Sequence, residues 1–289
     1  MDVYYMDKRL LRILPKVQKP ARYTGGEYNQ IIKDKENVDI RMALCFPDTY
    51  EIGMSNLGMK ILYGVINEMG GVWCERVFAP WGDMEDEMRK AGIPLWALES
   101  GDPLTDFDAI GFSIGYEMAY TNVLNMLNLS GIPIKSADRH ELTPIVFAGG
   151  TSCCNPEPMA DFFDLCVIGE GEDMDRELLL LLRRAKKDNL SKREFLSEAA
   201  KIDGVYVPSL YNPIYNADGT LQKIEVLDGA PELVTRRLVT DFDKSYFPVK
   251  PIVPSTEIVH DRVTLELFRG CIRGCHTCPR SRRTRGSSR

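Results

Sequence analysis

The sequence lacks any apolar run close to the ~20 residues that a helix needs to cross a membrane. Its first twenty residues also lack the basic, apolar and small-residue order of a secretory signal peptide. We therefore expect a cytoplasmic protein with no membrane partner. With 23 Gly and 17 Pro, the 289 residues are neither low in complexity nor collagen-like, and their length suits about two domains of ~150 residues each.

Basic residues are outnumbered, because 36 Lys and Arg face 42 Asp and Glu, for a net charge of −6. The last eleven residues, 279–289, contain five of these Arg and no acid, so the rest of the chain is more acidic still. Phosphate contacts need a basic surface, and only this short tail offers one. Nucleic acid is therefore not an expected partner.

Eight cysteines in a chain with no export signal do not indicate a disulfide framework, because the cytosol keeps thiols reduced. Cys45, Cys74 and Cys166 lie singly in apolar runs, which predicts small buried side chains. Cys153 and Cys154 are adjacent, and we expect loop or core thiols there. The remaining three form a tight cluster near the end of the sequence.

Short apolar runs alternate with amphipathic segments over residues 38–187, after a polar arm at 1–37 that we expect to be a short helix and a loose segment. This alternation is typical of βα units, and it predicts an α/β domain with a doubly wound, mostly parallel sheet. The predicted strands are 38–46, 71–78, 107–114, 144–150 and 165–172. The predicted helices are 56–69, 84–92, 120–129 and 173–187.

The pattern changes after residue 187. Residues 188–259 predict a connector with a helix at 192–200, a β-hairpin that turns at 216–219, and a proline-rich stretch. A further strand is predicted at 262–270, within a segment 260–278 that ends in the cysteine cluster. Residues 279–289 form the Arg-rich tail.

The cluster reads Cys271-Ile-Arg-Gly-Cys275-His-Thr-Cys278, a C-x3-C-x2-C array that directly follows the predicted strand. Thiolates are soft ligands that suit zinc, copper(I) or iron–sulfur clusters. A structural zinc site normally has four protein ligands, and no fourth is obvious here. Three cysteines can instead hold three irons of a 4Fe-4S cluster and leave the fourth open. A zinc site or a vestigial site in a non-catalytic binding or assembly module is the alternative.

Because of this C-x3-C-x2-C array, the sequence resembles the radical S-adenosylmethionine (SAM) superfamily. Phrases such as GGTSCCNPEP, GVYVPSLY and RGCIRGC are similar to an uncharacterised bacterial family with a cobalamin-binding-like N-terminal domain. The resemblance implies that the three cysteines bind a 4Fe-4S cluster whose open iron chelates SAM. It also implies reductive cleavage of SAM to a 5′-deoxyadenosyl radical, in the first part of a (βα) barrel. A small redox protein is the implied electron donor, and the substrate is unknown.

The chain departs from the family at two places. Thr277 stands where members usually have an aromatic residue, and the sequence after Cys278 does not resemble barrel sequence. We expect a truncated or frame-shifted chain in which a downstream protein supplies the rest of the barrel. The isolated chain is then expected not to cleave SAM.

Cobalamin-binding domains of this type carry Asp-x-His-x-x-Gly, Ser-x-Leu and Gly-Gly motifs, and this chain has matching positions at the ends of predicted strands. Tyr50 replaces the histidine that ligates cobalt, and a neutral phenol is a poor substitute. Cobalamin without that ligand and a relic domain that packs on the barrel both stay open, and we favour the absence of tight cobalamin binding. The candidate cofactor-binding residues are Asp48, Tyr50, Gly53, Ser113, Gly149 and Gly150.

Overall fold

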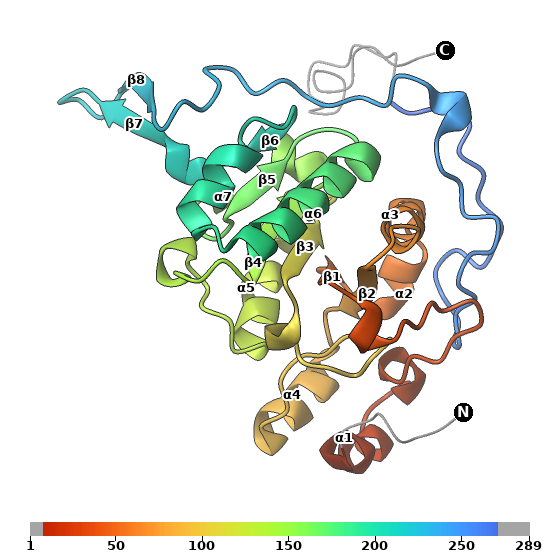
Figure 1. The fold of residues 1–289 in the computed structure, drawn as a ribbon. Coiled ribbons are helices and arrows are strands. Elements are labelled where there is room, and N and C mark those ends of the chain that lie inside the picture. The colour runs from red at the N-terminus through yellow and green to blue at the C-terminus, as the bar shows by residue number, and fades with distance from the viewer. Residues whose placement is uncertain (1–7, 271–289) are drawn as a thin grey trace. The chain divides into compact units, whose positions relative to one another are not determined.

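A six-stranded sheet in the order β2-β1-β3-β4-β5-β6 forms the centre of the fold (Figure 1). The structure, a computed structural model, describes residues 8–270. Strands β1 to β5 are parallel, and β6 pairs antiparallel with β5. The strands are β1 (Ile40–Phe46), β2 (Val72–Phe78), β3 (Ala109–Ser113), β4 (Ile145–Gly149), β5 (Leu165–Val167) and β6 (Val205–Tyr206).

Helices cover both faces of this sheet, because successive strand residues point to opposite sides. Met42 and Leu44 pack with α3, α6 and α7, whereas Ala43 and Cys45 pack with α1, α4 and α5. The predicted α/β class with a mostly parallel sheet is therefore confirmed. The helices are α1 (Lys8–Ile13), α2 (Tyr50–Met54), α3 (Leu57–Asn67), α4 (Gly82–Ala91), α5 (Tyr120–Leu129), α6 (Gly171–Asp188) and α7 (Lys192–Ala199).

The fifth strand is shorter than predicted. The sheet is mixed at this edge, because β5 pairs parallel with β4 and antiparallel with β6. After Val167 the chain leaves the sheet, and Ile168 bonds instead to Gly204 and Arg237. The two residues of β6 complete the sheet on that side. A strand of two residues has no hydrophobic periodicity, so its place in the sheet could not be predicted from the sequence.

The N-terminal arm is not loose, contrary to expectation. Leu10 and Ile13 of α1 are buried against the sheet domain, and Tyr23 and Glu27 are buried farther along the arm. Tyr28 forms an antiparallel bridge with Val253, so the arm also meets the proline-rich stretch. Burial of these apolar side chains holds the arm in place.

The predicted hairpin is present as β7 (Tyr211–Tyr215) and β8 (Leu221–Val226), a separate two-stranded sheet. Its turn contains Gly219 at a φ of +82°. Tyr211 and Leu210 at the base of the hairpin pack on the sheet domain.

The strand predicted at 262–270 is not formed. Residues 8–259 lie in one compact unit, and residues 260–270 belong to a second. Within this second segment the described residues form no hydrogen-bonded strand, and Val263, Leu265 and Leu267 are exposed. An alternating pattern becomes a strand only where a neighbouring strand satisfies its backbone groups, and among residues 8–270 no strand pairs with this segment.

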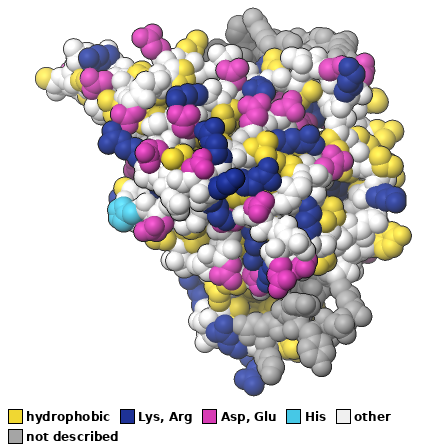
Figure 2. Space-filling model, in the orientation of Figure 1, with side chains coloured by type: hydrophobic (Ala, Val, Ile, Leu, Met, Phe, Trp, Pro, Cys, Tyr) yellow, Lys and Arg dark blue, Asp and Glu magenta, His cyan; other side chains and the backbone are white. Residues whose placement is uncertain are grey.

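Charges of both signs cover the face of the molecule drawn in Figure 2, where Lys and Arg side chains lie among Asp and Glu. The helix α6 carries Arg183, Arg184, Lys186 and Lys187, and acidic partners such as Asp39 and Asp108 lie beside it. Among the helices of residues 8–270, none is both long and apolar enough to cross a bilayer.

Candidate functional site

Four of the candidate residues lie at the carboxyl edge of the sheet, as the sequence predicts. Asp48 follows β1, Ser113 ends β3, and Gly149 and Gly150 end and follow β4. The strand order reverses between β1 and β3, and open α/β sheets bind ligands at such a switch point. The fold therefore brings these residues to the edge where a ligand is expected.

Gly150 shows why glycine follows β4. Its φ is +101°, and a Cβ there would lie 2.6 Å from the carbonyl oxygen of Ile114. The loops after β3 and β4 approach this closely because Ile114 donates its N–H to Gly149 and accepts one from Ser152. The close approach of two loops explains this glycine without a ligand.

Side chains fasten the loops at the switch point to one another. The Tyr116 hydroxyl donates to the Asp48 carboxylate at 2.7 Å, and Asn122 Nδ2 donates to the Pro47 carbonyl at 2.9 Å. The hydrogen bond to Asp48 raises the pKa of Tyr116, whose side chain is 43% exposed. We call this contact the Tyr116–Asp48 pair. It joins the segments after β1 and β3 across the switch point.

Tyr50 and Gly53 do not join this group. Tyr50 is the first residue of α2 and is only 2% exposed, with its ring edge-on to Phe78 at 5.4 Å between centroids. Its hydroxyl donates to Glu27 at 2.9 Å and accepts the N–H of Ser255 at 3.4 Å. A Cβ at Gly53 would lie 2.2 Å from the Phe78 ring, so that glycine permits packing. Both residues serve the side of the fold where β2 lies.

A buried arginine organises that side. Arg76 of β2 is 3% exposed, and its guanidinium donates to both oxygens of Glu27, at 2.8 and 3.0 Å. Its Nε and its backbone N–H donate to the two oxygens of Glu99, each at 2.6 Å. We call these three residues the Arg76 network. Bidentate, charge-assisted bonds of this kind fix geometry strongly.

Burial acts differently on the two carboxylates of the Arg76 network. Burial opposes ionisation of Glu27, but the charge and hydrogen bonds of Arg76 outweigh it, and the pKa of Glu27 lies below its ordinary value. Burial raises the pKa of Glu99 to about 7 against the pull of Arg76. This network was not predicted, although the charged pair Glu75-Arg76 inside the apolar strand predicted at 71–78 is a signal for it.

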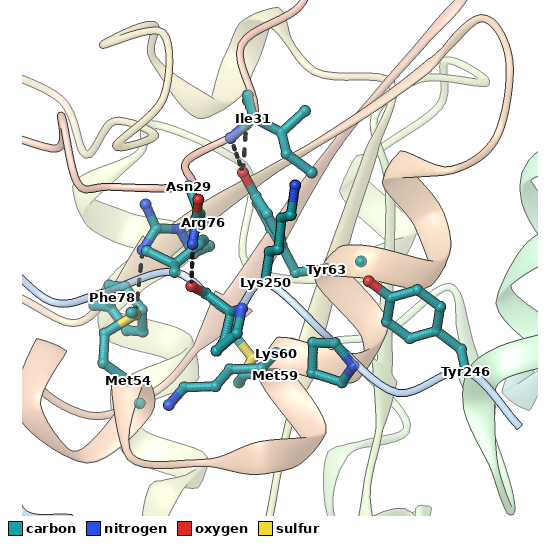
Figure 3. A pocket seen from close by; sticks show the side chains of 15 residues that line it. Asn29, Ile31, Met54, Met59, Lys60, Tyr63, Arg76, Phe78, Tyr246 and Lys250 are labelled. Carbon is teal, nitrogen blue, oxygen red and sulfur yellow. Dashed lines mark hydrogen bonds between the residues drawn. The ribbon is translucent and has the colours of Figure 1, made fainter. Parts of the chain in front are cut away.

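A small pocket of about 40 Å³, open to solvent, lies beside the network between α2, α3, β2 and residues 246–252 (Figure 3). Its floor is apolar, with Met54, Met59 and Phe78. Tyr63 accepts the N–H of Ile31 at 2.8 Å, and Asn29 donates to the carbonyl of Pro251 at 2.9 Å. These polar groups hold the surrounding backbone segments, and they do not converge on the space between them.

Asp175 of α6 is a second buried carboxyl outside the candidate set. It is 3% exposed, and in the part of the chain that the structure describes its Oδ1 has no hydrogen-bond partner. Burial, with a smaller contribution from the charge of Glu172, raises the pKa of Asp175 to about 7. This side chain is therefore largely protonated below neutral pH.

The three cluster cysteines, Cys271, Cys275 and Cys278, lie outside the described residues. Within 8–270, no three His, Cys, Asp or Glu side chains are placed to hold a metal ion. Cys45, Cys74 and Cys166 are buried as predicted, and burial raises the pKa of the Cys45 thiol.

Comparison with known proteins assigns the sheet domain. The sequence model of a family described as radical SAM proteins, N-terminal, matches residues 58–208. This chain belongs to that family. The match runs from α3 to the end of the sheet, so it includes Ser113 and Gly150 but begins after Tyr50.

The radical SAM N-terminal domain also has a distant curated relative. An uncharacterised protein of the archaeon Methanocaldococcus jannaschii is 25% identical over 239 residues, which are 82% of this chain and 40% of that protein. The chain therefore spans well under half the length of that relative. No solved structure matches this chain.

Proposed function

We propose that this chain is the N-terminal sheet domain and cluster loop of a radical SAM enzyme, in which Cys271, Cys275 and Cys278 hold a 4Fe-4S cluster. The observation that carries the proposal is the family match over 58–208, followed in the same chain by the C-x3-C-x2-C array. When bound, the cluster and SAM supply reductive cleavage of SAM to a 5′-deoxyadenosyl radical.

The thiolates of Cys271, Cys275 and Cys278 are chemically suited to a 4Fe-4S cluster. Three thiolates at this spacing supply three soft ligands and leave one iron for an outside ligand, which SAM provides through its amino and carboxylate groups. A closed zinc site needs a fourth protein ligand, and His276 would have to compete with cysteines on either side of it. A small redox protein is proposed as the electron donor, because the cleavage needs one electron.

The sheet domain is proposed to support the barrel rather than to ligate cobalt. The Tyr50 ring faces Phe78, and its hydroxyl is engaged by Glu27 and Ser255. The Tyr116–Asp48 pair holds the loops at the switch point, where a cofactor would otherwise enter. These contacts favour a relic of a cobalamin-binding domain whose loops now position neighbouring segments.

Anaerobic reconstitution with iron and sulfide tests the proposal. We expect about four iron and four sulfide per chain, with brown charge-transfer absorption. Single Cys271→Ala, Cys275→Ala and Cys278→Ala variants should each lose most of this absorption. Cys154→Ala, which removes a half-exposed thiol elsewhere, is the matched control and should retain it.

Two outcomes would contradict the proposal. One zinc per chain without sulfide would support the non-catalytic module instead. Equal iron and sulfide in the parent protein and in a variant that lacks all three cysteines would show that the bound iron is adventitious.

A further inference from the structure

The β7–β8 hairpin presents an apolar face that the described residues leave open. By the observed register, Pro213 lies opposite Ile224, and Tyr215 lies opposite Leu221 because the register shifts by one residue between Ile214 and Tyr215. This shift brings Leu221 to the same face as Ile224. Tyr215, Leu221 and Ile224 are 60%, 52% and 54% exposed. The other face carries Lys223 and Glu225. An isolated two-stranded hairpin is marginal in water, so an apolar face of this kind points to a partner.

The hairpin is held firmly at its base. Leu227 donates its N–H to the carbonyl of the buried Leu210, and the Tyr211 hydroxyl donates to the carbonyl of Pro231 at 2.7 Å. The rings of Tyr206 and Tyr211 stack at 4.9 Å between centroids. These contacts hold the base of the hairpin, which Figure 1 shows as β7 and β8, while the side chains from Leu221 to Glu225 are exposed.

The two outer edges of the hairpin are not equivalent. Because Leu227 bonds to Leu210, the alternation of an antiparallel ladder directs the N–H groups of Ile224 and Val226 away from β7. On β7, the position opposite Ile224 is Pro213, which has no N–H to offer an added strand. Proline blocks edge pairing, so β8 is the edge that can accept another strand.

The sequence of β8 is complementary to itself. In an antiparallel pair of two β8 strands centred on Ile224, Lys223 of one copy stands opposite Glu225 of the other, and this occurs twice by symmetry. The two Ile224 side chains meet on the apolar face. Opposite charges directly across a strand pair stabilise it, and like charges destabilise it.

We propose that a second copy of this chain pairs with β8 in this register and forms a two-fold dimer with a four-stranded sheet. The dimer needs neither the cluster nor SAM, so it stands independently of the proposed function. One strand pair buries less than a standard interface, and the expected Kd is in the weak range, on the order of 10–100 μM.

Charge reversal tests this register, with Kd measured by sedimentation equilibrium under reducing conditions. Lys223→Glu and Glu225→Lys should each weaken the dimer on the order of tenfold, because each places like charges together at two positions. The double variant Lys223→Glu/Glu225→Lys should restore the Kd to within about threefold of the parent, because it exchanges the two charges.

Lys187→Glu controls for net charge, because it makes the same change at an exposed position of α6 and should leave the Kd unchanged. The reversals keep the hairpin intact, since Lys223 faces Ile214 and Glu225 faces Asn212 within it. Amide hydrogen exchange gives a second measurement. The N–H groups of Ile224 and Val226 should exchange more slowly as protein concentration rises, whereas those of Lys223 and Glu225 should not change.

Three outcomes would overturn the proposal. The first is a monomer at concentrations on the order of 1 mM, which would show that another partner covers the hairpin or that none does. The second is a dimer that either single reversal leaves unchanged. The third is a double variant as weak as the single variants, which would exclude this register.

Discussion

The Arg76 network joins β2 to the N-terminal arm and to the segment between α4 and β3, whereas the Tyr116–Asp48 pair joins two loops that follow strands. The two also lie in different surroundings. Arg76 is almost completely buried, with its guanidinium between two carboxylates. Tyr116 is 43% exposed, and its hydroxyl makes one bond to Asp48. Loss of a partner leaves an unsatisfied charge in the first case, whereas water can replace the partner in the second.

In the sheet domain, the contacts expected to matter most for stability therefore lie apart from the residues that match cofactor-binding motifs. The residues that match cofactor motifs by sequence lie mainly at the solvated switch point, whereas the Arg76 network lies beside β2. Three substitutions test the comparison.

Arg76→Met is expected to have the largest effect. It leaves Glu27 and Glu99 buried without their cation, which should lower the free energy of unfolding by about 3–5 kcal/mol at pH 7. Urea unfolding followed by circular dichroism measures this loss. Arg89→Met removes an exposed arginine paired with Glu85 on α4, and the expected loss is below about 1 kcal/mol. Equal losses in the two variants would contradict the comparison.

Asp175→Asn extends the comparison to a buried carboxyl whose Oδ1 has no hydrogen-bond partner among residues 8–270. The pKa of Asp175 is raised to about 7, above its ordinary value of 3.8, so the folded state holds this proton more tightly than the unfolded state. The free energy of unfolding is therefore fully retained below pH 4 and declines as the pH rises toward 7. The variant should therefore be more stable than the parent at pH 8, by at most roughly 4 kcal/mol for a pKa raised by about three units, and the difference should shrink as the pH falls toward 4.

Urea unfolding at several pH values provides this measurement. Asp173→Asn, at an exposed position of the same helix, should show no such pH dependence. A constant difference between Asp175→Asn and the parent from pH 4 to pH 8 would mean that the Asp175 carboxyl titrates normally.

Tyr116→Phe is expected to have the smallest effect, because it removes one half-exposed hydroxyl and leaves the ring. The free energy of unfolding should fall by at most about 1 kcal/mol. Tyr28→Phe, on an exposed tyrosine of the arm, serves as the reference in the same urea titration. A loss above about 2 kcal/mol would place the Tyr116–Asp48 pair with the buried contacts.

Much of the sheet could be predicted because its strands are apolar runs bounded by turns. The helix predicted at 120–129 begins and ends at those residues, and the strand predicted at 144–150 appears as β4. The prediction failed where a distant partner decides the structure. Residues 262–270 carry a strand pattern, but no strand in the described part of the chain pairs with them, and β6 depends on its pairing with β5.

The candidate site was predictable only in part, for a similar reason. Topology alone brings Asp48, Ser113 and Gly150 to one edge, because carboxyl ends of parallel strands meet there. The direction of the Tyr50 side chain depends on Glu27 and Ser255, which are far from it in sequence. A motif shows where a residue lies along the chain, but not which segments pack over it.

The contact between Asn29 and Pro251 has a consequence for synthesis, because 222 residues of chain separate these two residues. Ribosomes add roughly 5–20 residues per second, so the arm waits roughly 10–45 seconds after its own translation before this partner is made. The bond from Asn29 to Pro251 can therefore form only after nearly the whole sheet domain has been translated, whereas the partners of Glu27 at Tyr50 and Arg76 are made much earlier.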